Sequence, residues 1–256
     1  MAIITPTNKS VLSLKGLHLY HTGFSNCAMR VRMTLEEKGL EWVSHPIDLM
    51  KDENLSAEYI GINPNAVVPT LVDDGVVIID SADIIDYLNE KFTSGSLSPN
   101  TNSDQQQMYD WIYLARDNHL SIKTYMYSNM RGLPSRKKSA QQMDEYRNKQ
   151  TFDAALVEFH ERNSSEQGFS QKELHKAKTV IDDCFQKMDN RLKDNPWLAG
   201  DHFSLADIAW IPQLVILKVV GYPLENYPHL EKWKASIIER PSFKNGVLAW
   251  LPAMAK

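Results

Sequence analysis

Residues 20–32, Tyr20-His-Thr-Gly-Phe-Ser25-Asn26-Cys27-Ala-Met-Arg-Val-Arg32, decide the fold of the first part of the chain. The apolar residues before them predict a strand over 16–21, and the amphipathic run that follows predicts a helix over 25–39. Ser25 and Cys27 therefore lie at the N-terminal end of this helix, where backbone N–H groups are unpaired and the helix dipole is positive. Such a position stabilises a thiolate, so Cys27 can titrate below its usual pKa of about 8.5.

Two simpler interpretations of this stretch stay open. Serine is a preferred N-cap residue, and Ser25 fits that purpose without any catalytic role. A single cysteine near a helix start is often a small buried apolar residue, which is also what we expect of Cys184 in a helical core stripe. The motifs in the rest of the chain favour a chemical role for Ser25 and Cys27.

The composition and charge of the chain exclude several classes of protein. The 256 residues, 43% of them hydrophobic, are enough for two globular domains. The formal net charge of −4 and the lack of a long basic block argue against nucleic acid as a partner. No run approaches the roughly 18 apolar residues of a membrane span, and the N-terminus lacks the arrangement of a signal peptide. We therefore expect no nucleic acid and no membrane as partners.

The two cysteines, Cys27 and Cys184, lie far apart in the sequence. They form neither a disulfide framework nor a metal-binding pattern, so we expect no metal. Free cysteines are typical of a reducing compartment, and we expect a cytoplasmic protein.

The first part of the chain has the pattern of a small α/β domain, for which we expect the boundaries 15–93. Residues 1–14 are expected to be an irregular N-terminal extension. A β-α-β unit favours a parallel, right-handed crossover. The predicted order is β-α-β-α-β-β-α, with elements at 16–21, 25–39, 41–46, around 57–60, 70–73, 76–79 and 82–92.

Two further motifs in this domain could contact a ligand. Val68-Pro69 stands at the entrance of a strand, where the missing N–H of proline is tolerated. If this bond is cis, which the sequence does not decide, Val68 could present its backbone N–H and C=O to the occupant of a cleft. Asp80-Ser81 precedes a helix, so Ser81 is either a helix cap only or part of a carboxylate site.

After a turn-rich linker at 94–102, the strand pattern gives way to helical periodicity, and residues 103–256 are expected to form an all-helical domain. Ser204-Leu-Ala-Asp207 resembles a capping box. The helix that it opens is apolar on nearly all sides and should be buried. The expected helices cover 104–130, 139–165, 171–193 and 204–220, with shorter ones at 228–238 and 242–250.

The chain resembles the glutathione transferase superfamily over nearly its whole length. The stretches that carry this resemblance are 63–70, 80–81, 196–201, 204–208, 227–233 and 239–243. The resemblance implies a fold of α/β plus all-α class, with a thioredoxin-like domain followed by a glutathione transferase-type helical domain. It also implies glutathione as co-substrate, a small hydrophobic electrophile as second substrate, and a homodimer.

Within the superfamily, the chain most resembles the dehalogenases that act on tetrachlorohydroquinone. The pattern Ser-x-Cys-x-Met-x-x-Arg is matched at 25–32, and Ala-Val-Val-Pro-Thr-Leu at 66–71. By this resemblance Cys27 is the nucleophile, and Ser25 hydrogen-bonds the glutathione sulfur. The implied glutathione-binding residues are Ser25, Asn26, Lys51, Val68, Pro69, Asp80 and Ser81, with Val68-Pro69 pairing with the cysteinyl part and Asp80-Ser81 holding the γ-glutamyl end.

These residues suggest two related reactions. Ser25 and the helix N-terminus would stabilise a glutathione thiolate that attacks an electrophilic carbon. Cys27 would attack the sulfur of a glutathionyl conjugate, leaving a mixed disulfide that a second glutathione resolves, as in reductive dehalogenation or deglutathionylation. Aromatic candidates for the hydrophobic wall, which could equally be core residues, are Tyr113, Tyr125, Tyr127 and Trp210.

Two alternatives remain. The first is a glutathione-dependent β-aryl etherase, in which Ser25 would be the working residue. The second is a non-catalytic protein of the same fold that binds glutathione or regulates a partner.

Overall fold

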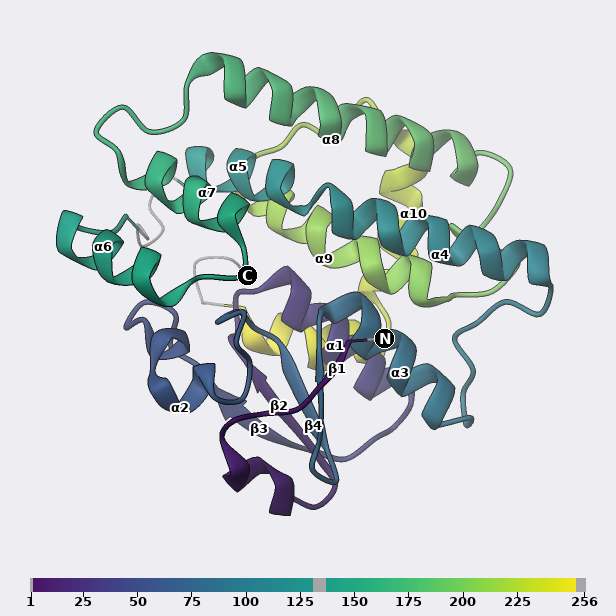
Figure 1. Cartoon of the computed structure of the whole chain (residues 1–256). Helices are drawn as coiled ribbons and strands as arrows, with labels where there is room; N and C mark the ends of the chain where they lie inside the picture. The colour runs from purple at the N-terminus through teal and green to yellow at the C-terminus, as the bar shows by residue number, and fades with distance from the viewer. Residues whose placement is uncertain (1, 131–136, 252–256) are drawn as a thin grey trace.

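A five-stranded mixed sheet forms the centre of the first domain in the computed structural model, which describes residues 2–130 and 137–251. The strands lie in the order β1-β5-β4-β2-β3 (Figure 1). β2 pairs with β3 in parallel through the predicted β-α-β crossover, and the other pairs are antiparallel. The bounds are β1 (Ile3–Ile4), β2 (Leu17–His21), β3 (Trp42–Pro46), β4 (Thr70–Asp73) and β5 (Val76–Ile79).

The helices of this domain lie close to their predicted places. They are α1 (Asn26–Glu37), α2 (Ala57–Ile60) and α3 (Ser81–Lys91), with single 3-10 turns at Lys9–Ser13 and Glu53–Leu55. The expectation of an irregular stretch over residues 1–14 is wrong, because Ile3–Ile4 pairs with the outer edge of β5 and Val11 is buried. An edge strand of two residues is too short to leave a periodic signal in the sequence.

The second domain is helical, as expected, but two of the expected helices are each divided. The helix expected at 104–130 is α4 (Asn102–Asp117) and α5 (His119–Asn129), and the one expected at 139–165 is α6 (Ala140–Lys149) and α7 (Ala154–Ser164). The remaining elements are α8 (Gln171–Leu192), α9 (Leu205–Val219), α10 (Pro228–Ile238), α11 (Pro241–Gly246) and a 3-10 turn at Leu248–Trp250.

Side-chain hydrogen bonds to the local backbone account for both divisions. Asn118 donates from Nδ2 to the Leu114 carbonyl at 2.9 Å and closes the end of α4. Asp153 accepts from the Leu156 N–H at 2.9 Å and caps the start of α7. The first division matters for the site, because it makes His119 the first residue of α5.

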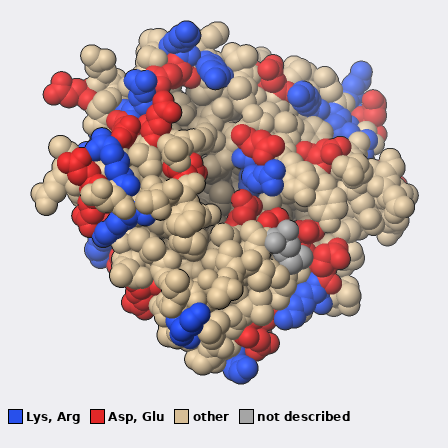
Figure 2. Space-filling model, viewed as in Figure 1, with Lys and Arg blue, Asp and Glu red and all other residues tan. Residues whose placement is uncertain are grey.

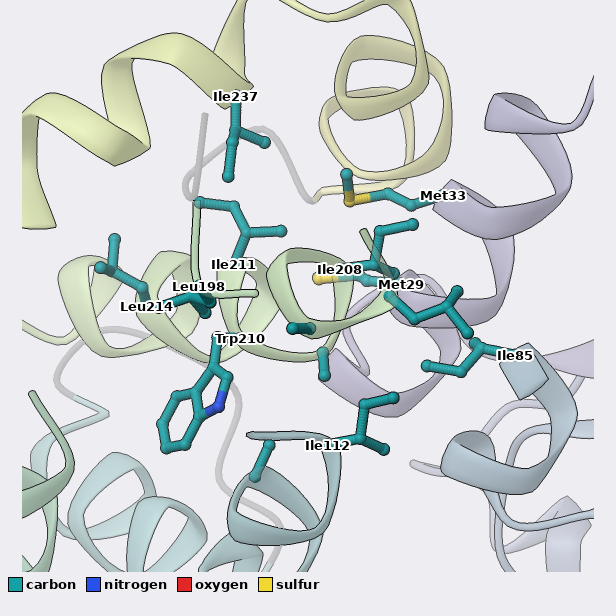
Figure 3. Packing of buried hydrophobic residues seen from close by; sticks show 14 of the residues in the cluster. Met29, Met33, Ile85, Ile112, Leu198, Ile208, Trp210, Ile211, Leu214 and Ile237 are labelled. Carbon is teal, nitrogen blue, oxygen red and sulfur yellow. The ribbon is translucent and has the colours of Figure 1, made fainter. Parts of the chain in front are cut away.

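The buried helix α9 connects the two domains. Its inner residues pack against Met29 and Met33 of α1, Ile85 of α3 and Ile112 of α4 (Figure 3). The predicted capping box is confirmed, since the Ser204 side chain and the Asp207 carboxylate each accept from backbone N–H groups at the helix start. The α1 helix is thereby held between the sheet and the helical domain.

The loop before α1 is held by the last described part of the chain. Arg32 donates from Nε to the Gly246 carbonyl at 2.8 Å and from Nη2 to the Gly23 carbonyl at 2.9 Å. A Cβ on Gly23 would lie 2.6 Å from the Trp250 carbonyl oxygen, so no larger residue fits there without a backbone shift. These contacts fix the turn that leads to Ser25 and Cys27.

The helices α6 and α7 lie beside α2 and extend over one side of the first domain (Figure 1). Met143, Tyr146, Leu156 and Phe159 pack with Leu55 and Ala66 in a separate hydrophobic cluster. Lys138 forms an ion pair with Asp52 at 2.5 Å across this contact. Figure 2 shows positive and negative side chains interspersed on this face, without a large patch of one sign.

Candidate active site

A cleft of about 520 Å³ lies between the two domains. One wall comes from the loop before α1, the start of α1, the segment before β4 and the start of α3. The other wall comes from α5, α6 and α7. The lining residues used below are Ser25, Asn26, Cys27, Arg30, Val68, Pro69, Asp80, Ser81, His119, Lys123, Tyr127 and Lys138.

Cys27 occupies the first turn of α1 and is only partly buried. Its Sγ lies 4.0 Å from Nδ1 of His119, a residue 92 positions later in the chain. Asn26 contacts both residues: its Oδ1 accepts from the Cys27 N–H at 3.0 Å, and its Nδ2 lies 3.3 Å from Nδ1 of His119. A thiol, an imidazole and an amide therefore meet where the domains face each other.

The surroundings of Cys27 favour the thiolate. Burial alone would raise the pKa of the thiol, but the positive charge and hydrogen bond of His119, the charge of Arg30 and a hydrogen bond from Ser81 outweigh it. Together they lower the pKa of Cys27 from 9.0 to about 6, so most of the group is ionised at neutral pH. Nucleophilic cysteines have this kind of electropositive, accessible setting.

Ser25 is the N-cap of α1, and its Oγ accepts from the Ala28 N–H at 3.3 Å. Capping uses the oxygen as acceptor and leaves the hydroxyl hydrogen able to donate. The structural and the chemical interpretations of Ser25 are therefore compatible.

Asp80 and Ser81 begin α3 and line the same cleft. Asp80 has a φ of 66° and accepts from the Ala82 N–H at 2.8 Å. Ser81 is buried, and its Oγ accepts from Nη1 of Arg30 at 3.2 Å. Arg30 also donates from Nε to the Ala209 carbonyl at 2.9 Å, while its buried Nη2 has no hydrogen-bond partner within residues 2–130 and 137–251.

The Val68-Pro69 peptide bond is cis, and both residues line the cleft. Two hydrogen bonds fix the backbone just before this bond. The Val67 carbonyl accepts from the Tyr59 hydroxyl at 2.7 Å and from Asn63 Nδ2 at 3.0 Å. The three motifs singled out in the sequence, at 25–27, 68–69 and 80–81, thus meet in one place.

Other expected site residues lie elsewhere. Lys51 is exposed, pairs with Asp48 at 3.3 Å and does not line the cleft. Trp210 is fully buried in the core, and Tyr125 packs edge-on against Tyr222. Tyr113 is exposed on α4 beneath Arg116. Of the aromatic candidates on the helical domain, Tyr127 lines the cleft.

Three residues that line the cleft were not expected from the sequence: Arg30, His119 and Lys138. No local motif marks His119, which lies at the start of α5 and which the fold brings to within 4.0 Å of the Cys27 sulfur. Arg30 lies inside the recognised stretch, but its burial depends on α9 packing against α1. Lys138 lies within residues 131–170, to which the sequence pattern assigned no role in the site.

The part of the chain that the structure describes contains no cluster of three or more His, Cys, Asp or Glu side chains that could hold a metal ion. Among those same residues, no helix combines the length and apolar character needed to cross a bilayer.

The fold and the site together define a class of protein: a thioredoxin-like domain, with a cysteine at the first helix and a cis-proline before a strand, joined to a helical domain that closes the cleft. Comparison with known families gives the particular family. Residues 24–91 match the glutathione S-transferase N-terminal domain, and residues 117–241 match the glutathione S-transferase C-terminal domain. The chain belongs to the glutathione S-transferase superfamily.

Individual relatives agree with this assignment. Glutathione S-transferase 1 of Dianthus caryophyllus is 28% identical over 232 residues, which cover 89% of this chain and 90% of that protein. Glutathione S-transferase TCHQD of Arabidopsis thaliana is 25% identical over 238 residues, covering 89% and 88%. The crystal structure of the β-etherase LigF from Sphingobium sp. strain SYK-6 aligns with a TM-score of 0.78 and 25% identity, covering 90% of this chain and 98% of LigF.

Proposed function

We propose that this protein is a glutathione-dependent enzyme that removes the glutathionyl group from a hydrophobic conjugate by way of Cys27. The observation that carries the proposal is the thiol at the start of α1, whose pKa is lowered to about 6 at the mouth of a cleft between the domains. Ionised at neutral pH and accessible, such a thiol is suited to attack a sulfur atom.

The glutathione moiety would lie along the first domain. Its γ-glutamyl end would bind at the start of α3, beside Asp80 and Ser81, where a helix N-terminus favours a carboxylate. Its cysteinyl part would pair with the backbone at Val68, before Pro69. This arrangement directs the glutathione sulfur toward the start of α1 and leaves the helical wall for the second substrate.

Intact-mass measurement after incubation with oxidised glutathione tests the proposal. We expect one glutathionyl adduct on the wild type, removed by reduced glutathione, and none on Cys27→Ser. Cys184→Ala is the matched control, because it removes the buried cysteine, and it should form the same adduct as the wild type. An adduct that persists in Cys27→Ser, or a wild type that binds glutathione without forming one, would refute this mechanism.

A β-aryl etherase is the second candidate, supported by the likeness to LigF and by the Ser25 hydroxyl, which can still donate to a glutathione thiolate. Cleavage of a model β-aryl ether distinguishes the two. An etherase would retain its activity in Cys27→Ser and lose it in Ser25→Ala, whereas the first proposal expects no such cleavage.

Four narrower expectations accompany the first proposal. Reductive dehalogenation of chlorinated hydroquinones is one form of the same chemistry, and detoxification would be its purpose. A cytoplasmic location and a homodimer also remain predictions, the latter testable by sedimentation. Glutathione binding without turnover of any conjugate would favour the non-catalytic alternative. The lowered pKa of the Cys27 thiol argues against that alternative, because a protein that only binds glutathione does not need a thiolate.

A further inference from the structure

The imidazole of His119 is the feature of the cleft that the motifs did not anticipate. It comes from the helical domain, is partly buried, and places Nδ1 4.0 Å from the Cys27 sulfur. We propose that His119 is a catalytic proton carrier for Cys27, and that Asn26 is the residue that positions it. This inference rests on the proposed function, because it assigns the proton transfers that the Cys27 chemistry requires.

The orientation of the Asn26 amide follows from its partners. The Cys27 backbone N–H can only donate, so the atom 3.0 Å from it is the Asn26 oxygen. The amide nitrogen therefore faces Nδ1 of His119 at 3.3 Å. This donor can hydrogen-bond Nδ1 of the neutral imidazole, so Asn26 holds the ring of His119 beside the Cys27 sulfur.

Proton balance gives His119 two tasks in the cycle. The proposed cycle starts from a Cys27 thiolate beside a protonated His119. The thiolate attacks the sulfur of the conjugate, an S–S bond forms, and the S–C bond breaks with its electron pair leaving on carbon. That carbon takes the proton from His119, so the substrate is reduced and leaves as the hydrogen-substituted product.

The second half of the cycle returns the proton. Neutral His119 accepts the thiol proton of a second glutathione, whose thiolate attacks the Cys27 mixed disulfide. Glutathione disulfide leaves, and the Cys27 thiolate and protonated His119 are restored. Over the whole cycle one conjugate and one glutathione give one reduced product and one glutathione disulfide, with no other oxidant or reductant.

The role proposed for His119 predicts which substrates the enzyme turns over, because leaving groups differ in their need for a proton. A carbon leaving group is a strong base and needs a proton as it departs, whereas a thiolate leaving from a mixed disulfide does not. His119 therefore fits conjugates in which glutathione is bonded to an activated carbon, such as one next to a ketone, better than simple disulfides.

The first test measures alkylation of Cys27 by iodoacetamide from pH 5 to 10 without glutathione, in wild type and His119→Gln. In His119→Gln the pKa of the Cys27 thiol should return toward its usual value of about 8.5. Alkylation of this variant at pH 6.5 should then be at least tenfold slower than that of the wild type, and the two rates should be equal at pH 10. His175→Gln, an exposed position on α8, is the matched control and should behave as the wild type. Superimposable profiles would overturn the proposal.

The second test compares two substrates at pH 7, where the loss of Cys27 thiolate in His119→Gln slows both reactions by a common factor. His119→Gln should slow turnover of S-phenacylglutathione about 100-fold more than that of a glutathionyl mixed disulfide, because only the carbon leaving group needs a proton from an acid. Equal slowing of both would refute the proton-carrier role. If the wild type turned over neither substrate, the proposed function would be refuted. The alkylation test would still show whether His119 lowers the pKa of the Cys27 thiol.

Discussion

At the scale of single residues, the two cysteines show how surroundings determine reactivity. Cys27 is partly exposed, and its neighbours lower the pKa of its thiol to about 6. Cys184 lies on the buried face of α8, where burial raises the pKa of its thiol to about 11. One thiol is therefore mostly ionised at neutral pH, and the other belongs to a small apolar residue of the core.

The hydroxyl of Ser81 offers a prediction at this scale. It accepts from Arg30 and hydrogen-bonds the Cys27 sulfur, so Ser81→Ala removes a donor from the thiolate. A hydrogen bond to a charged group contributes about 1.5 kcal/mol or more, so the pKa of Cys27 should rise by about one unit. The pH dependence of thiolate absorbance at 240 nm measures the shift. Ser121→Ala, on α5 and outside the cleft lining, should leave it unchanged, and an unshifted Ser81→Ala curve would contradict the assignment.

At the scale of the elements, the capping box of α9 depends on a single carboxylate, that of Asp207. The Asp207 carboxylate is fully buried and accepts from the Trp233 indole N–H at 2.7 Å, the Ser204 N–H at 2.9 Å and the Leu198 N–H at 3.1 Å. Because all these partners donate, an amide at this position would turn its own N–H groups toward one of them.

Asp207→Asn should therefore lower the free energy of unfolding by about 3 kcal/mol, as expected when a buried, hydrogen-bonded charge is lost. Urea denaturation followed by tryptophan fluorescence measures the change. Asp201→Asn makes the same substitution at an exposed position near the start of α9 and should have little effect. Equal midpoints for Asp207→Asn and the wild type would show that these hydrogen bonds do not stabilise α9.

The sequence predicted the elements with strong periodicity and missed those set by tertiary contacts. The strands around β2, the helix α1 and the buried helix α9 follow from apolar patterns that repeat over their whole length. The division between α4 and α5 depends on one asparagine side chain, and the strand β1 on the free edge of β5. The same limit applies to the site, where local motifs revealed 25–27, 68–69 and 80–81 but not His119, which only the folded chain brings to Cys27.

At the scale of the whole molecule, an ion pair joins the end of α1 to the start of α11. Glu37 accepts from Nε of Arg240 at 2.6 Å and from its Nη2 at 2.7 Å, and also from the Ser242 hydroxyl. Burial alone would raise the pKa of the Glu37 carboxyl, but the hydrogen bonds from Arg240 and Ser242 outweigh it and lower the pKa. The two domains are thereby linked electrostatically as well as by apolar packing.

This link makes stability depend on pH in a defined direction. A carboxyl whose pKa is lowered by folding contributes stability that is complete above its unfolded pKa of about 4.5 and is lost as the pH falls through the folded value. Arg240→Met should therefore unfold more easily than the wild type by about 1–2 kcal/mol at pH 7, and the difference should shrink below pH 4.5. Urea denaturation at a series of pH values measures it.

Arg147→Met is the control for this series, because it removes two exposed ion pairs, with Asp144 and Glu161, and should change little at any pH. A difference between Arg240→Met and the wild type that stays constant from pH 7 to pH 3 would contradict the role given to Glu37.

The hydrogen bonds of Arg32 have a consequence for how the protein is made. The ribosome releases the thioredoxin-like part first, yet Arg32 finds the Gly246 carbonyl, and the loop at Gly23 finds Trp250, only after more than 150 further residues have followed α3. A nascent chain that has emerged only as far as α3 therefore carries Cys27 next to a loop that lacks its final support. We expect the thiol to become fully reactive only after the segment with Gly246 and Trp250 has emerged, which delays its chemistry until the helical wall is present.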